Sequence, residues 1–273
     1  MKKNLWSAAK TIIGLAGLLF YIYPIILILI SCVKSKKEMA LNPFGFPKVI
    51  NFENITKAFG RMNYWQTLLN TVIITVAVVG LTLLISSMAA YAISRKGKKY
   101  SWLYYLFLSG LLVPFQMIMI PLYKLVMNLH MINSIPGIIA VYLATQCPMA
   151  IFLLTGFVKL VPCEVEEAAY IDGAGIFRTF FTIVLPMMRN SLVTVALLTA
   201  FRVWNDFLMP MLFLQERTKL TLTVMLSNFQ GQYFNDWSMM FAGVALIALP
   251  MIVVYLVAQK YIINGITAGS VKG

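Results

Sequence analysis

Two oppositely charged residues, Arg202 and Asp206, lie within a long apolar run of the chain. They are four residues apart and would share one face of a helix, so we predict that they form an ion pair. Trp204 and Asn205 lie between them and add an indole ring and an amide. Such a group can bind a polar ligand through hydrogen bonds and an apolar ring face. The alternative is a structural ion pair that holds helices together.

Residues typical of catalytic or metal sites are few. Three cysteines, Cys32, Cys147 and Cys163, are far apart, and the chain has a single histidine, His130. The sequence contains neither a metal-ligand spacing nor a nucleophile grouped with a base. We therefore predict no catalytic residue, no metal site and no cofactor bound by this chain itself.

A second group of polar residues interrupts the apolar sequence between residues 159 and 190. Its central part, residues 166–186, reads EEAAYIDGAGIFRTFFTIVLP. Three glutamates follow Pro162 and suit the positive end of a helix dipole, and Gly173 stands where a helix commonly ends. We predict a helix, a glycine turn and a second helix over IFRTFFTIV. Taken alone, this element could lie in a membrane interface or dock into another protein.

The composition around these residues is that of a membrane protein. Of the 273 residues, 60% are hydrophobic and 11% are charged, whereas a soluble domain has about 25% charged residues. Unbroken apolar runs of about 20 residues indicate helices, because backbone groups in lipid must bond within their own segment. The predicted fold class is an all-α membrane protein, one transmembrane domain over residues 1–273 with six transmembrane helices at about 11–33, 69–93, 102–123, 135–158, 192–214 and 239–261.

Six spans place both termini on one side of the membrane. Lysines and arginines are divided almost evenly between the two faces, but the short loop SRKGKKY, residues 94–100, carries four of them. Cations in short loops favour the cytoplasmic side, so we predict that both termini and segment 159–190 are cytoplasmic. The net charge of +13 then comes from lysines and arginines that flank the helices and lie near anionic lipid headgroups. We expect no nucleic-acid partner. The first apolar run is too long for a signal peptide and is predicted to be a retained helix.

Segment 159–190 resembles the EAA loop of the permease subunits of bacterial ABC importers. The pattern is E-A-A, three residues, G, nine residues and I-x-L-P, filled here by Glu167, Ala168, Ala169, Gly173, Ile183, Leu185 and Pro186. The sequence Asp172-Gly173-Ala174 resembles the sugar-importing branch of this family. One departure is Asn190, which stands near a position where many relatives carry proline.

Two further stretches resemble sugar permeases. Residues 204–207, WNDF, are followed by Pro210, as in the WN[DE]F…P pattern of the fifth span. Residues 265–273, GITAGSVKG, are similar to the terminal G-x-T-x-G-A-V-K-G, with Ser270 in place of alanine. The resemblance covers nearly the whole chain and is closest to the smaller of the two permeases of maltose-type importers.

The resemblance implies a transport subunit without an ATPase site of its own. In that family the EAA loop holds a coupling helix that docks into a cytoplasmic ATPase subunit, so Glu167 would make the contact and Gly173 the tight turn. The chain has no G-x-x-x-x-G-K-[ST] loop, and ATP and Mg²⁺ would be bound by the partner ATPase. The implied partners, in a bacterial cytoplasmic membrane, are a second homologous permease, two ATPase subunits, an extracytoplasmic sugar-binding protein, the sugar and the lipid bilayer.

The substrate path is predicted to include Arg202, Trp204, Asn205 and Asp206, since an aromatic ring beside hydrogen-bonding groups suits a sugar. Polar residues of the second span, among them Asn70 and Thr71, either line this path or bind helices together. Another cargo, such as glycerol-3-phosphate, is an alternative within the family. A self-sufficient secondary transporter is an alternative of a different class, expected to carry several carboxylates near the midplane, whereas only Asp206 lies well inside a span.

Overall fold

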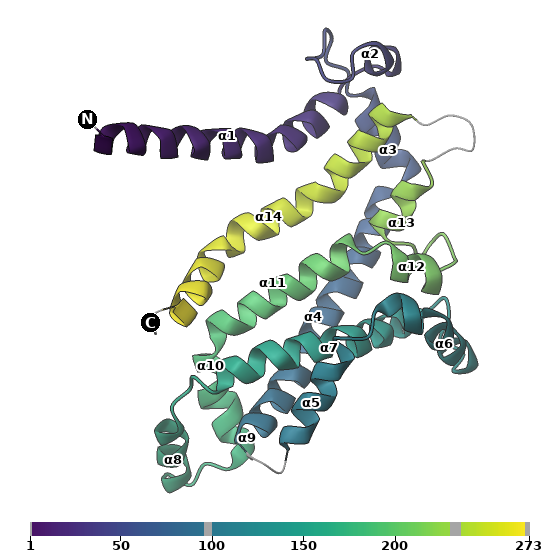
Figure 1. Ribbon diagram of the computed structural model, residues 1–273. Coiled ribbons are helices and arrows are strands. Elements are labelled where there is room, and N and C mark those ends of the chain that lie inside the picture. The colour runs from purple at the N-terminus through teal and green to yellow at the C-terminus, as the bar shows by residue number, and fades with distance from the viewer. Residues whose placement is uncertain (1, 96–99, 230–235, 271–273) are drawn as a thin grey trace. The chain divides into compact units, whose positions relative to one another are not determined.

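The computed structural model describes residues 2–95, 100–229 and 236–270, and helices are the only regular elements in these ranges (Figure 1). The predicted all-α class is therefore confirmed. The chain divides into two compact units, each built from two stretches of sequence. Unit 1 comprises residues 1–65 and 224–252, and unit 2 comprises residues 66–223 and 253–273.

Four continuous helices are long and apolar enough to cross a membrane. They contain the predicted spans 11–33, 69–93, 135–158 and 239–261, up to about two residues at the ends, and are α1 (Lys2–Ser31), α4 (Tyr64–Arg95), α7 (Ile135–Val158) and α14 (Trp237–Ser270). The residues at the start of α7 explain why this helix begins at Ile135. Ser134 accepts a hydrogen bond from the Gly137 backbone N–H at 3.1 Å, and Pro136 occupies the first turn, where its missing N–H leaves no donor unpaired.

The predicted third span, residues 102–123, is not one straight helix. It consists of α5 (Ser101–Gly110) and α6 (Phe115–Asn128), which meet at an angle of 98°. Pro114 precedes the first residue of α6 and has an extended backbone. Its ring disfavours helical geometry at the residue before it, so α5 ends and α6 starts in a new direction.

The predicted fifth span, residues 192–214, is also interrupted. Helix α11 (Arg189–Asn205) ends before Asp206, whose ψ of 134° is extended, and α12 (Leu208–Phe213) follows. At its other end, α11 meets the helical stretch Ile176–Met187 at 77°. The described ranges thus hold four spans by length and composition, or up to six if each bent pair crosses the membrane as one.

Unit 1 holds two short helices after α1, namely α2 (Lys36–Leu41) and α3 (Glu53–Arg61). Lys34 lies between α1 and α2 and is fully buried. Its ammonium group donates to the backbone carbonyls of Asn42 and Pro43, each at 3.0 Å. These two acceptors offset part of the cost of burying the charge. The short helix α13 (Leu222–Ser227) begins in unit 2 and ends in unit 1.

The core of unit 2 is formed around α7. Both α5 and α11 pack against α7. One apolar cluster joins α4 and α7 to the segment between α7 and α11, with Tyr91, Leu154, Val158, Phe180 and Val184 all buried. The segment predicted to be a docking loop is therefore packed onto two membrane-spanning helices.

Candidate functional site: the segment between α7 and α11

The predicted helix, glycine turn and second helix are present in this segment. Helix α8 (Cys163–Ile171) begins after Pro162 and ends at Asp172, and α9 (Ile176–Thr179) follows. Gly173 has a φ of +81°, the left-handed region that favours glycine. The Gly173 N–H donates to the Tyr170 carbonyl at 3.0 Å, and the Ala174 N–H donates to the Ala169 carbonyl at 2.9 Å. This pair of bonds is a Schellman motif, which ends the helix sharply.

The second helical piece changes its winding before it reaches Pro186. After α9 comes a π-helical turn, η2 (Phe180–Val184), and then α10 (Leu185–Met187). In a regular α-helix the Pro186 ring would collide with the carbonyl of Thr182, four residues earlier. A wider π turn relieves that collision, because it moves the carbonyls of the preceding turn outward.

The residues of the EAA pattern lie on two different sides of the segment. Ala169 is buried, and Ile183 and Leu185 are half-buried. The remaining four, Glu167, Ala168, Gly173 and Pro186, are exposed, as is Asp172 beside Gly173. The pattern therefore combines an inner face that packs on unit 2 with an outer face that is open to a partner.

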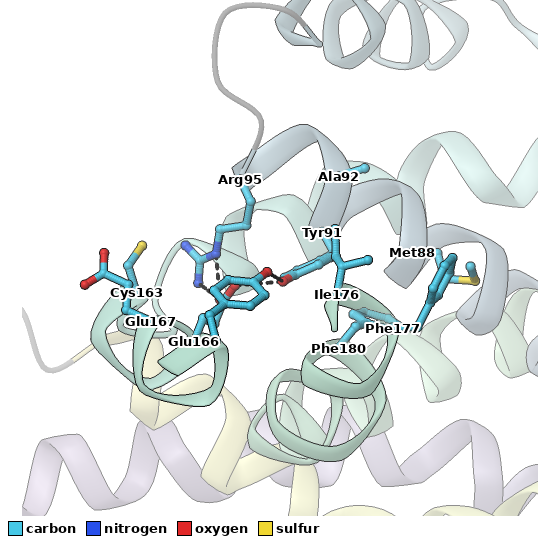
Figure 2. Close-up of a pocket in the computed structure, with 11 residues that line it drawn as sticks. Met88, Tyr91, Ala92, Arg95, Cys163, Glu166, Glu167, Ile176, Phe177 and Phe180 are labelled. Carbon is cyan, nitrogen blue, oxygen red and sulfur yellow. Dashed lines mark hydrogen bonds and ion pairs between the residues drawn. The ribbon is translucent and has the colours of Figure 1, made fainter. Parts of the chain in front are cut away.

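The inner face of α8 is held by a charged residue that the sequence did not single out. Glu166 is 5% exposed, and its Oε1 atom accepts a hydrogen bond from Nε of Arg95 at 2.7 Å and forms an ion pair with Nη2 of the same side chain, also at 2.7 Å. Its Oε2 atom accepts from the Tyr91 hydroxyl at 2.8 Å. Arg95 also donates to the Val161 carbonyl at 2.7 Å. We call Tyr91, Arg95 and Glu166 the α8 anchor; Figure 2 shows the three side chains pointing toward one another.

The sequence did carry a signal for this anchor. Glu166 and Ala169 are three residues apart and share a helix face, whereas Glu167 points about 100° away from Glu166. Both Glu166 and Ala169 are buried, and Glu167 is exposed. Since a helix that packs on a core turns one face inward, neighbouring glutamates must have different surroundings.

Beside the α8 anchor lies a cavity of about 640 Å³, framed by α4, α8, α9 and η2. Figure 2 shows Met88, Ile176 and Phe177 on one side of it and the ion pair on the other. Tyr91 forms part of the wall and lies against Phe180, with 5.1 Å between the ring centroids. The anchor thus joins α4 to both halves of the segment.

The predicted ion pair between Arg202 and Asp206 is wrong. Within the part of the chain that the structure describes, Asp206 Oδ2 accepts from the Tyr142 hydroxyl at 2.9 Å, Oδ1 accepts from the Leu208 N–H at 3.0 Å, and Arg202 makes no ion pair with it. The bond from the Leu208 N–H holds the Asp206 side chain at the start of α12. A contact between Arg202 and Asp206 would need α11 to continue through residue 206, but α11 ends at Asn205.

The other residues of the predicted substrate path do not share one surface. Trp204 is 5% exposed, whereas Asn205 is exposed and its amide donates to the Phe201 carbonyl at 2.9 Å. Arg202 is exposed and lines a small cavity of about 180 Å³ with Gln146 and Thr199. The structure therefore separates Arg202 from Asp206 and gives each a different set of neighbours.

Comparison with known proteins identifies the family. The family described as "Binding-protein-dependent transport system inner membrane component" matches residues 82–267, more than half of the chain. The chain belongs to this family. This confirms the resemblance that was predicted from the EAA spacing. With its apolar helices, the chain is a multi-pass membrane protein.

Relatives in this family match over almost the full length. The chain is 34% identical to the "Probable starch degradation products transport system permease protein AmyC" of Thermoanaerobacterium thermosulfurigenes, over 96% of this chain and 96% of that one. It is also 34% identical to the "Melibiose/raffinose/stachyose import permease protein MelC" of Bacillus subtilis (strain 168), over 92% of this chain and 91% of that one.

A solved structure shares the fold. A chain from the crystal structure of a bacterial ABC transporter involved in the import of the acidic polysaccharide alginate superposes with a TM-score of 0.84, covering 96% of this chain and 98% of that chain. The sequence identity is 22%, so the likeness concerns the fold. Two stretches used in the sequence interpretation, residues 96–99 of the basic loop and the side chains of the tail 265–273, lie outside the described residues.

Proposed function

We propose that this chain is one of two permease subunits that form the pore of an ATP-driven importer for a sugar or short oligosaccharide. The observation that carries the proposal is the two-sided α8: its inner face is fixed to α4, and its outer face presents Glu167, Ala168 and Asp172. A helix that is rigidly held on one side and open on the other is suited to dock into a partner and pass on its movement.

In this proposal the partner of the outer face is a cytoplasmic ATPase subunit. The acidic residues Glu164 and Glu166 in the first turn of α8 suit the positive end of the helix dipole, and Glu167 adds an exposed negative charge. A cationic cleft would complement this end of the helix. Two ATPase subunits would bind ATP and Mg²⁺, because the sequence lacks a phosphate-binding loop of its own.

Transport then follows from differential contact with two states of the ATPase. Closure of the ATPase pair would displace α8, and through the α8 anchor it would displace α4. Both termini and segment 159–190 are cytoplasmic in this arrangement, and an extracytoplasmic binding protein delivers the cargo. The chain contributes no bond-making step; it converts a contact at α8 into a rearrangement of the spans.

The cargo class is proposed from the relatives. Their names refer to starch degradation products, to melibiose, raffinose and stachyose, to arabinooligosaccharides and to diacetylchitobiose. These cargoes differ in their sugars but are all small saccharides. Sugars combine an apolar ring face with many hydroxyl groups, and the polar residues Gln146, Thr199 and Arg202 at one small cavity offer hydrogen bonds.

The test is reconstitution in liposomes. The complex is purified through this chain and reconstituted with its binding protein outside the liposomes, and uptake of labelled raffinose, maltotriose and glycerol-3-phosphate is measured with and without internal ATP. We expect ATP-dependent uptake of an oligosaccharide and co-purification of an ATPase and a second permease. Glu167→Arg should lose the ATPase, whereas Glu53→Arg, a charge reversal at an exposed glutamate of unit 1, should retain it.

Two results would contradict the proposal. Uptake by this chain alone without ATP would indicate a secondary transporter. ATP-dependent uptake of glycerol-3-phosphate in preference to both oligosaccharides would support the ATP-driven importer and contradict the saccharide cargo.

A further inference from the structure

Helix α4 is tied at both ends to segments distant in the sequence. Near its C-terminal end, the α8 anchor connects it to the proposed coupling helix. Near its N-terminal end, Asn70 and Thr71 connect it to the backbone of residues 218–222, and we call this set the loop anchor. All of these residues belong to unit 2.

The α8 anchor is built to resist displacement. Both oxygens of the Glu166 carboxylate are hydrogen-bonded, and the side chains of Arg95 and Glu166 are only 17% and 6% exposed. Charge-assisted hydrogen bonds are about twice as strong as neutral ones, and low exposure reduces their screening by solvent. Movement of α8 without α4 would leave a buried carboxylate without partners.

The loop anchor has the same character without charge. The Asn70 amide donates to the carbonyls of Thr218 at 2.8 Å and Leu220 at 3.0 Å. The Thr71 hydroxyl accepts from the Leu222 N–H at 3.1 Å and donates to the Thr67 carbonyl at 2.7 Å. Asn70 and Thr71 are 7% and 2% exposed, so water does not replace these bonds. The two residues therefore bind segments together, one of the two roles predicted for polar residues of this span.

Between the two anchors α4 is an uninterrupted helix. The sequence from Tyr64 to Arg95 contains no proline, and the structure shows a single helix over these residues. At 1.5 Å per residue, Asn70 and Arg95 are about 38 Å apart along its axis. Prolines and π-bulges are common causes of a sharp kink, and neither interrupts α4 between the two anchors.

Residues 215–223, which include the backbone held by the loop anchor, are called the outer segment. We infer that α4 is the element by which the outer segment 215–223 and the coupling helix α8 affect each other, with Asn70, Thr71, Tyr91 and Arg95 as positioning residues. The inference rests on the proposed function, because that function places the two anchors on opposite faces of the membrane. A change at the outer segment shifts α4 along its axis or tilts it, and the α8 anchor passes the shift to the ATPase contact. Such coupling is reciprocal, so ATPase closure also shifts segment 215–223.

The experiment uses the purified complex and measures ATP hydrolysis with and without sugar-loaded binding protein. The quantity of interest is the stimulation ratio per assembled complex, which a loss of folded protein alone does not change. Thr71→Val keeps the shape of the side chain and removes the hydroxyl that binds Leu222, whereas Thr71→Ser keeps the hydroxyl. Thr194→Val is the matched control, because the described bond of that hydroxyl is to the Asn190 carbonyl of its own helix, at 3.0 Å.

We expect Thr71→Val to lower the stimulation ratio about fivefold or more, in line with usual coupling strengths, and Thr71→Ser and Thr194→Val to leave it near wild type. Glu166→Gln should lower it as well. The double variant Thr71→Val with Glu166→Gln should have the same stimulation ratio as the single variant with the lower ratio, because both substitutions interrupt one connection.

Four results would count against the inference. An unchanged ratio in Thr71→Val would remove the loop anchor from the coupling. Multiplied losses in the double variant would mean two independent effects. A wild-type complex that hydrolyses ATP without responding to binding protein would refute the inference and leave the ATPase contact of the proposed function intact, whereas the absence of any ATPase would refute both.

Discussion

Replacing Arg95 with leucine tests the α8 anchor directly. The substitution leaves the Glu166 carboxylate buried with the Tyr91 hydroxyl as its remaining side-chain partner and also frees the Val161 carbonyl. Removing one partner of a buried ion pair costs about 3–5 kcal/mol. Because the Arg95 side chain is 17% exposed, water reaches part of this site, and we expect the lower end of that range.

A cost of about 3 kcal/mol corresponds to roughly a hundredfold change in an equilibrium constant. Helix α8 is short and held mainly by its inner face, so it should open locally before unit 2 unfolds. Amide hydrogen exchange in residues 163–175 should therefore accelerate about a hundredfold in Arg95→Leu. Exchange in α7, residues 135–158, serves as the internal reference and should stay unchanged.

The double variant Arg95→Leu with Glu166→Leu separates charge from packing. Apolar residues that replace both members of a buried pair are often neutral or stabilising, so exchange in α8 should return toward the wild-type rate. The reasoning fails if Arg95→Leu leaves exchange in α8 at the wild-type rate, or if α7 accelerates equally.

Three further predictions concern single contacts. Gly173→Ala should destabilise the turn by about 1–2 kcal/mol, seen as weaker binding of the ATPase subunit, because its φ of +81° is strained for alanine; tight binding would contradict this. Tyr142→Phe should lower the free energy of unfolding, measured by thermal denaturation, by about 1.5–3 kcal/mol through loss of the bond to Asp206. Arg202→Met should change it by less than about 0.5 kcal/mol, and equal effects of the two substitutions would support an ion pair between Arg202 and Asp206. Hydrogen bonds from Lys219 and Thr218 lower the pKa of Glu216 to about 2, so the stability that this loop contact contributes is fully present above pH 4.5 and is lost as the pH falls toward 2. The reactivity of the Lys219 amine, corrected for its own protonation, should therefore stay constant as the pH falls from 7 to 4. A change centred on pH 4.5, the ordinary pKa of a glutamate, would refute the contact.

Local signals in the sequence predicted the turn of the EAA segment correctly. Helix ends depend on a few neighbouring residues, and Pro162 and Gly173 supply both ends of α8. The length of the apolar runs predicted six spans, of which four are continuous helices, since the thickness of a bilayer imposes a minimum length.

Prolines could not be interpreted without their surroundings. Pro24, Pro148 and Pro250 lie inside continuous helices, whereas Pro114 marks a bend of 98°. A proline removes one hydrogen bond in either case. Whether the helix continues depends on the packing of its neighbours, which is set by residues far away in the sequence.

The charged residues posed a related problem. The expected pair of Arg202 and Asp206 assumed that α11 continues, but the Asp206 side chain caps the next helix instead. A buried pair does form between residues 95 and 166, which are brought together by the packing of α8 on α4. Periodicity relates residues on one helix and cannot choose between partners on different helices.

The division into two units has a consequence for the order in which the protein is made. Residues 66–223 contain most of unit 2 as one stretch, whereas unit 1 needs residues 224–252 to complement its first 65 residues. A chain emerges from the ribosome with its N-terminal end first. The core around α7 and both anchors of α4 can therefore assemble during synthesis, while the first helices wait for the last four residues of α13 and for α14 up to residue 252. Truncation after residue 223 should leave the α8 anchor formed and unit 1 incomplete.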